Sequence, residues 1–177
     1  MPAVIDKPSQ LFFAIAETLR GAGLGLKVGS HQDFDAVLDQ AWVLIAIERD
    51  APGMRSQEGR IAHVLTVSLQ AVAAVAAVGA ERSGFESCDL ASALKDLATD
   101  NRWGLPAAQC DLPMNLEGLP STLIRGEQQY AAWTLSFTQT LYLGQPLLDD
   151  PTGIPKFART WEVSNIDDPD QYQALEG

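Results

Sequence analysis

The sequence predicts an α+β domain: a mostly antiparallel sheet with a long hairpin, and helices packed on one face. Three observations carry this prediction. Two apolar runs are separated by a charged, turn-rich loop, a later segment alternates strictly between apolar and polar residues, and two further segments have apolar residues at helical spacing. Hairpin connections pair strands antiparallel and leave the helices to cover one side of the sheet.

The first helix is expected after Pro8, where apolar residues recur every three or four positions. Glycines from Gly21 onward end this helix, because glycine readily adopts the backbone conformation that closes a last turn. A shorter stretch with the same spacing predicts a short helix or helical turn that leads into the first strand. Its apolar members are Phe34, Val37, Leu38 and Ala41.

The hairpin is expected from two apolar runs. Residues 42–47 have no polar alternate, which predicts a central strand covered on both faces. Residues 61–72 contain Leu65, Val67 and Leu69 in alternation with polar residues, which is typical of a half-buried strand. The charged loop over residues 48–60 is too long for a tight turn, so it is expected to stand off the sheet as a contact surface.

A second helix is expected from Ser83, because Ser83 and Glu86 have the spacing of a capping box and an apolar stripe follows them. Residues 107–120 are rich in proline and glycine, which predicts an irregular connection. Residues 130–143 alternate between apolar and hydroxyl side chains, which predicts a strand with one wet face.

The segment after Pro146 is expected to contribute little to the core. A weak alternation through Phe157, Arg159 and Trp161 predicts an edge strand or an arm. Beyond it the chain is acidic and sparse in apolar residues, which predicts a flexible tail. The predicted organisation is therefore one α+β domain over residues 1–164 and a flexible acidic tail over residues 165–177.

The charge balance limits the partners that the chain can have. The 177 residues carry 12 Lys and Arg against 23 Asp and Glu, a formal net charge of -11. A nucleic-acid clamp is therefore not expected, because phosphate binding requires clustered basic residues. No apolar stretch reaches the length of a membrane span, and the first residues do not resemble a secretory signal, so synthesis and residence in a cytoplasm are expected.

No constellation of residues predicts chemistry, so no catalytic, cofactor or metal site is expected and the protein is not predicted to be an enzyme. His31 and His63 have no partner at ligand spacing, and structural histidines are the better interpretation. Cys88 and Cys110 have no metal-ligand spacing and are expected to be free thiols. The acidic residues of the tail lack the glycine and the final glutamate of a calcium loop.

Interface residues are expected in two places, the charged loop and the weak terminal strand. Long loops of mixed charge favour recognition, although a solvated loop is the competing interpretation. For the terminal strand, a tryptophan that plugs the core is the competing interpretation to an interface anchor. The candidates are Arg49, Met54, Arg55, Glu58 and Arg60 in the loop, and Phe157, Arg159 and Trp161 in the strand.

The order of elements resembles the tail-terminator and tail-completion proteins of long-tailed bacteriophages. The features that carry the resemblance are a leading amphipathic helix, a strand that runs into Glu48-Arg49-Asp50-Ala51-Pro52-Gly53, a long hairpin, a helix, and a strand through Trp133-Thr134-Leu135-Ser136-Phe137. The resemblance covers the chain from about Leu11 to Leu143. These proteins share element order and size rather than invariant residues, and the chain after Pro146 is longer than in their smallest members.

The resemblance implies a structural virion protein of the tail or neck, assembled in the host cytoplasm. Such proteins form a homo-oligomeric, hexameric ring that caps the tail tube protein and presents a surface to the head connector, and DNA passes through the lumen without specific binding. Three alternatives stay open: a head-closure or neck connector, an acidic DNA mimic that inhibits a nucleic-acid-binding protein, and a small enzyme that uses His31, His63, Cys88 or Cys110.

Overall fold

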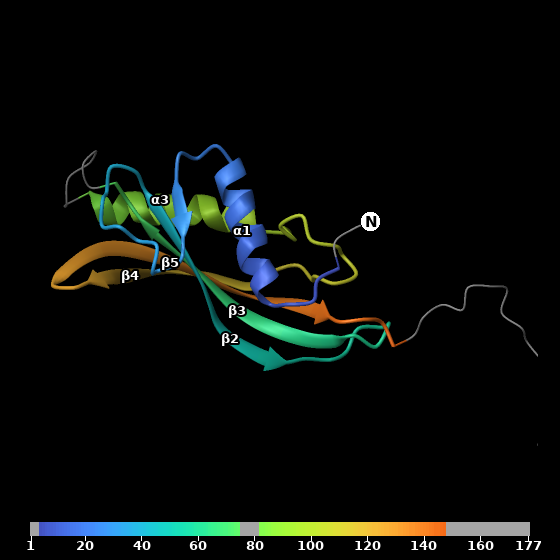
Figure 1. Ribbon diagram of the computed structural model, residues 1–177. Helices are drawn as coiled ribbons and strands as arrows, with labels where there is room; N and C mark the ends of the chain where they lie inside the picture. The colour runs from blue at the N-terminus through green and yellow to red at the C-terminus, as the bar shows by residue number, and fades with distance from the viewer. Residues whose placement is uncertain (1–3, 75–81, 148–177) are drawn as a thin grey trace, which may run out of the picture. The chain divides into compact units, whose positions relative to one another are not determined.

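The computed structural model describes residues 4–74 and 82–147. Over these residues the chain forms a five-stranded mixed sheet and two helices, which fits the α+β class (Figure 1). Contacts divide the chain into two units, Met1–Leu147 and Leu148–Gly177, and the first holds every element named here. In chain order the elements are α1 (Ser9–Gly21), β1 (Lys27–Gly29), β2 (Trp42–Pro52), β3 (Ile61–Val72), α3 (Ser83–Ala98), β4 (Met114–Arg125) and β5 (Gln128–Leu143).

The sheet has the strand order β1-β2-β3-β5-β4. β1 runs parallel to β2, and the other three pairs are antiparallel. The register pairs Val67 with Phe137 on one face, and Ser68 with Ser136 on the other. We call the second face the hydroxyl face; it carries Thr66, Ser68, Thr134, Ser136 and Thr138.

The main apolar core lies on the face opposite the hydroxyl face. Both helices contribute side chains to this single cluster, and Figure 1 shows both on the same side of the sheet. Buried leucines and valines of the strands, together with Ile45 and Phe137, fill most of the rest, so burial of apolar area is the main stabilising contribution. The helix residues in the cluster are Leu11, Ile15, Ala16, Leu19, Ala91, Leu94 and Ala98.

A second, smaller core lies on the other face, where residues 30–41 cross the sheet. Phe34 is 1% exposed and makes edge-to-face contacts with Trp42 and Tyr130. A short helix or helical turn is predicted at residues 34–41, but no helix forms there; the segment is irregular, with a turn at residues 38 and 39. The Asp35 carboxylate accepts a hydrogen bond from the Val37 backbone N–H at 2.9 Å, and such local bonds compete with a helix.

The hairpin is longer than predicted, because β2 continues through the charged residues to Pro52. Its far half pairs with residues 63–66 of β3 after a bulge between Ile47 and Arg49. The connecting loop is therefore only Gly53–Arg60. As predicted, β2 begins as an interior strand covered on both faces, with residues 42–45 buried. Because β1 pairs only with residues 42–44, the rest of β2 lies at the edge of the sheet.

Two further predictions need correction. The proline-rich segment is not irregular throughout, because β4 begins at Met114 and includes Pro120. Proline is compatible with this position because β4 is an edge strand, whose outward-facing N–H groups have no partner strand in the described sheet. The second helix forms, but Arg82 occupies the N-cap and no side-chain capping bond is made there.

In the described parts of the chain, no helix is long and apolar enough to cross a membrane.

Candidate assembly interface

The tip of the β2–β3 hairpin, Gly53–Arg60, has a defined shape. The Gly59 N–H donates to the Ser56 carbonyl at 2.9 Å, and the Ser56 N–H donates to the Arg60 carbonyl at 3.1 Å. Gly59 has φ +83°, and a Cβ at this position would lie 2.9 Å from the Cβ of Leu147. Glycine is therefore required for both the turn and the close approach.

The structure brings together three of the loop residues that were predicted to form an interface. The Arg55 guanidinium donates to the Gly59 carbonyl at 2.8 Å. The Arg60 side chain pairs with the Glu58 carboxylate at 2.9 Å and also donates to the Gly144 carbonyl at 2.7 Å. These bonds hold the tip against the end of β5, so Arg60 positions the tip.

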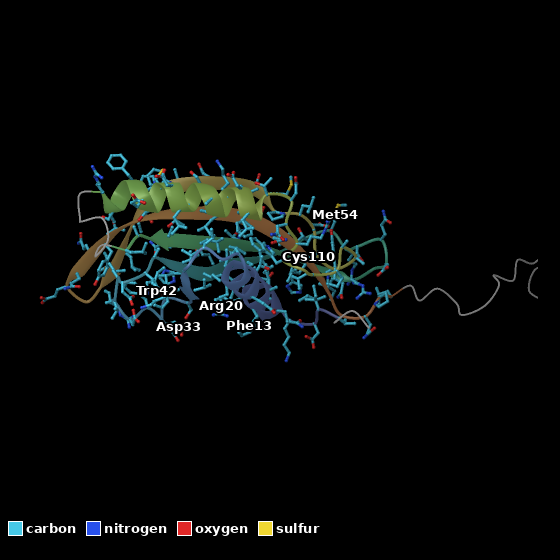
Figure 2. The ribbon with its side chains drawn as sticks, turned by 90° about the horizontal axis from the view of Figure 1, so that it is seen from above. Phe13, Arg20, Asp33, Trp42, Met54 and Cys110 are labelled. Carbon is cyan, nitrogen blue, oxygen red and sulfur yellow. The ribbon has the colours of Figure 1, made fainter. Side chains whose placement is uncertain are left out.

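Met54 is the most exposed large apolar side chain of the tip, at 88%. Figure 2 shows it at the hairpin end, away from the labelled residues of α1. Exposed methionine suits contact with another protein, because its flexible thioether adapts to the facing surface. Met54 is therefore the strongest of the predicted interface residues in the loop.

Arg49 lies outside the tip, within β2. Its register partner is Thr66, so its side chain is on the hydroxyl face. The remaining predicted interface residues, Phe157, Arg159 and Trp161, lie outside the described residues.

The histidines make local hydrogen bonds. His63 Nδ1 lies 2.8 Å from an Asp50 carboxylate oxygen, within the hairpin. His31 Nε2 lies 3.2 Å from the Gln70 side-chain oxygen. Among residues 4–74 and 82–147, no group of three or more His, Cys, Asp or Glu side chains is placed to hold a metal ion.

A buried polar cluster surrounds Gln139, which is 1% exposed. Its amide nitrogen donates to the Asp111 carbonyl at 2.8 Å, and its oxygen accepts from the Trp103 indole at 2.8 Å. The same nitrogen lies 3.2 Å from the sulfur of Cys110. Burial raises the pKa of the Cys110 thiol to about 12, which makes this cysteine a poor nucleophile at neutral pH.

A pocket of about 410 Å³ lies beside the hairpin tip, between residues 56–58 and 107–111. The Tyr142 hydroxyl donates to the Asp111 carboxylate at 2.8 Å on its wall. This hydrogen bond, together with partial burial, raises the pKa of Tyr142 above its ordinary value of 10.0. The phenol therefore stays protonated at neutral pH and serves as a donor that shapes the wall.

Two strands of the sheet, β2 and β4, have backbone groups without a neighbouring strand in the described structure. β1 covers only residues 42–44 of β2, which leaves the stretch from Ile45 to Pro52 as an open edge. β4 is open along its whole outer side. Sequence reasoning missed both edges, although Pro52 and Pro120 were signals, because proline within a strand marks an edge.

Each open edge is flanked by an apolar pocket. A pocket of about 460 Å³ lies beside β2, with Phe12, Ile45 and Ile47 in its lining. Residues 30–32, at the start of the crossing segment, also line it, so they stand beside the first part of the open edge. A pocket of about 350 Å³ lies beside β4, with Phe85 and Trp133 in its lining. Phe85 of the second pocket is 76% exposed, and Phe13, which is 66% exposed, makes an edge-to-face contact with Phe12 of the first pocket. Apolar surface beside an open strand is typical of a site where another polypeptide binds.

The arrangement is therefore suited to contacts between proteins, through the hairpin tip and the two sheet edges. No protein-family model matches the chain, and no curated protein matches it.

Proposed function

We propose that this protein is a tail terminator, a structural protein of the virion that forms a ring on the end of the tail tube. In this proposal the ring stops further tube polymerisation and offers its other face to the head connector. The hairpin arm carries the proposal: its tip is held by its own hydrogen bonds and displays Met54 at 88% exposure. A stiff arm with an apolar end is suited to insertion against a neighbouring subunit or the tube.

The fold class supports the same proposal. A mostly antiparallel sheet with both helices on one face leaves the opposite face free of helices. Three of the four strand pairs are antiparallel, and both helices contribute to one core cluster. A ring also needs two different patches that meet head to tail, and the hairpin tip and the open sheet edges are different surfaces of one chain.

The charge of the chain is compatible with DNA that passes through such a ring. With a net charge of -11, the subunits repel phosphate, so DNA is not held in the lumen. In this proposal the acidic residues have no ligand, and their role is to keep the passage free of specific binding.

Solution mass and negative-stain images test the ring directly. We expect closed rings of about six subunits, formed in solution or on purified tail tubes of the same phage. Protein bound at the ends of the tubes supports the terminator. Protein bound to filled heads and not to tubes favours a head-closure protein instead, and binding to neither contradicts both roles.

Substitution of Met54 tests the part played by the hairpin tip. We expect Met54→Asp to weaken binding to tube ends by roughly tenfold or more, because a charge replaces an apolar contact. Leu24→Asp is the matched control, since Leu24 is also an exposed apolar residue, at 44%, but lies in the loop after α1. Equal losses in both variants would show that the tip has no special role.

A further inference from the structure

The two open edges of the sheet are complementary in direction. Starting at β2, each strand is antiparallel to the next along β2-β3-β5-β4, so β4 runs opposite to β2. Consider a second copy whose β2 lies beside β4 of the first copy, with the main cores of both copies on the same side of the joined sheet. The new strand pair is then antiparallel. Such a contact continues the alternation of the sheet across the joint, and antiparallel pairing is the stable form.

The flanking surfaces of the two edges also match. On the side of the main core, β2 is bordered by the apolar pocket with Phe12 and Ile47, and β4 by the pocket with Phe85 and Trp133. Ile124 of β4 is 63% exposed. Joining the edges would bring these apolar surfaces together and remove them from water, which supplies the main driving force for association.

Charge complementarity favours this joint over pairing of like edges. Arg49 of β2 and Glu117 of β4 both lie on the hydroxyl face, through their register with Thr66 and Ser136. Both side chains are exposed, and neither belongs to an ion pair within the described residues. Pairing of two β2 edges would place Arg49 near another Arg49, whereas pairing of β2 with β4 places opposite charges on one face.

We propose that the open edge of β2, from Ile45 to Pro52, pairs antiparallel with β4 of a second copy, with Arg49 facing Glu117 across the joint. This inference rests on the proposed ring and names the surfaces that close it. Because the two edges are different, the contact is head to tail and repeats around a ring. The prolines and bulges of these strands restrict the register, so the edges do not pair at random.

Charge reversal tests the joint. We expect Arg49→Glu and Glu117→Arg each to raise the concentration for half-assembly by roughly tenfold, because each places like charges face to face in every joint. The double variant, Arg49→Glu with Glu117→Arg, is expected to regain assembly. Lys95→Glu and Asp96→Lys are the matched controls, since they make the same changes of charge on exposed positions of α3.

Hydrogen exchange gives a second readout that does not depend on substitution. In the assembled protein we expect slowed exchange at amides of residues 45–51 and 114–121, relative to the monomer at low concentration. Slowed exchange in β4 alone would indicate pairing of like edges and would overturn the proposal. So would assembly with both edges unprotected, a double variant that does not recover, or a chain that stays monomeric at about 1 mM both alone and with tail tubes.

The outcomes separate this inference from the proposed function. Rings that pass the charge-reversal test but do not bind tube ends would leave the joint standing and remove the terminator. A chain that binds tube ends with both sheet edges exchanging freely would keep the terminator and remove the joint.

Discussion

At the scale of single residues, short polar contacts determine the conformation of segments that lack regular structure. The Asp33 carboxylate accepts hydrogen bonds from the Ser30 backbone N–H and from the Ser30 hydroxyl, both at 2.7 Å. Lys27 pairs with Asp39 at 2.7 Å and with Asp35 at 3.4 Å. These contacts hold residues 30–41 across the sheet, where a helix was expected.

The Asp33 turn predicts a dependence of stability on pH. The two bonds from Ser30 hold the pKa of Asp33 below its ordinary value of 3.8. A carboxyl with a lowered pKa in the folded state stabilises the protein above the unfolded pKa, and the contribution is lost as the pH falls through the folded pKa. Asp33→Asn is therefore expected to be less stable than the parent at pH 7 and equally stable at about pH 2.

Urea unfolding midpoints at pH 7, 4 and 2 measure this difference, provided that both proteins unfold in one transition. Asp6→Asn serves as the control, because Asp6 is an exposed aspartate for which no side-chain hydrogen bond occurs among the described contacts. A gap between Asp33→Asn and the parent that stays constant from pH 7 to pH 2 would show that ionisation of Asp33 does not stabilise the turn.

At the scale of elements, a bulge decides which face of the sheet a side chain occupies. The bulge after Ile47 moves Arg49 to the hydroxyl face, beside Thr66. Without the bulge, the alternation from Ile45 and Ile47 would place residue 49 on the side of the main core. One inserted residue thus changes what the far half of the hairpin presents to a partner.

The crossing segment over residues 30–41 is an element in its own right, held by Phe34 against Trp42 and Tyr130. We expect Phe34→Ala to lower the free energy of unfolding by about 3–5 kcal/mol, because it removes a buried ring and leaves a cavity. Phe85→Ala, at a ring that is 76% exposed, is expected to change it by less than about 0.5 kcal/mol. Equal effects measured by urea unfolding would contradict a core role for Phe34.

At the scale of the whole molecule, the large negative charge opposes association of copies. Each chain carries a net charge of -11, and at low salt this repulsion acts over about 30 Å. The proposed joint must overcome it through apolar contact and through the pairing of Arg49 with Glu117. Salt weakens both the repulsion and that single pair, but the repulsion involves many more charges.

Assembly is therefore expected to strengthen as NaCl rises from about 10 to 100 mM, over which the screening length falls to about 10 Å. Sedimentation velocity at fixed protein concentration measures the change. The Arg49→Glu variant should show a stronger salt response than the parent, because it adds repulsion within the joint. Assembly that weakens steadily with salt would show that attraction between charges dominates.

Much of the fold is readable from the sequence. The first helix, the hairpin strands, the second helix and the strand predicted at residues 130–143 all form, although β2 runs beyond its predicted end and β5 begins two residues earlier. Periodicity succeeds in these segments because one side of each is buried in the common core, so the pattern of apolar residues follows the geometry of the element. Part of the candidate interface was likewise predicted, since Met54 and Arg55 lie on the hairpin tip.

The sequence by itself determined the helices, the paired strands and the excess of negative charge, because local periodicity and composition encode them. Only the tertiary structure decided that β1 covers no more than residues 42–44 of β2, that β4 is an edge, and that Arg49 and Glu117 share a face. These features depend on strand order, on register and on a bulge. Contacts between residues far apart in the chain set all three, and no short window of sequence contains them.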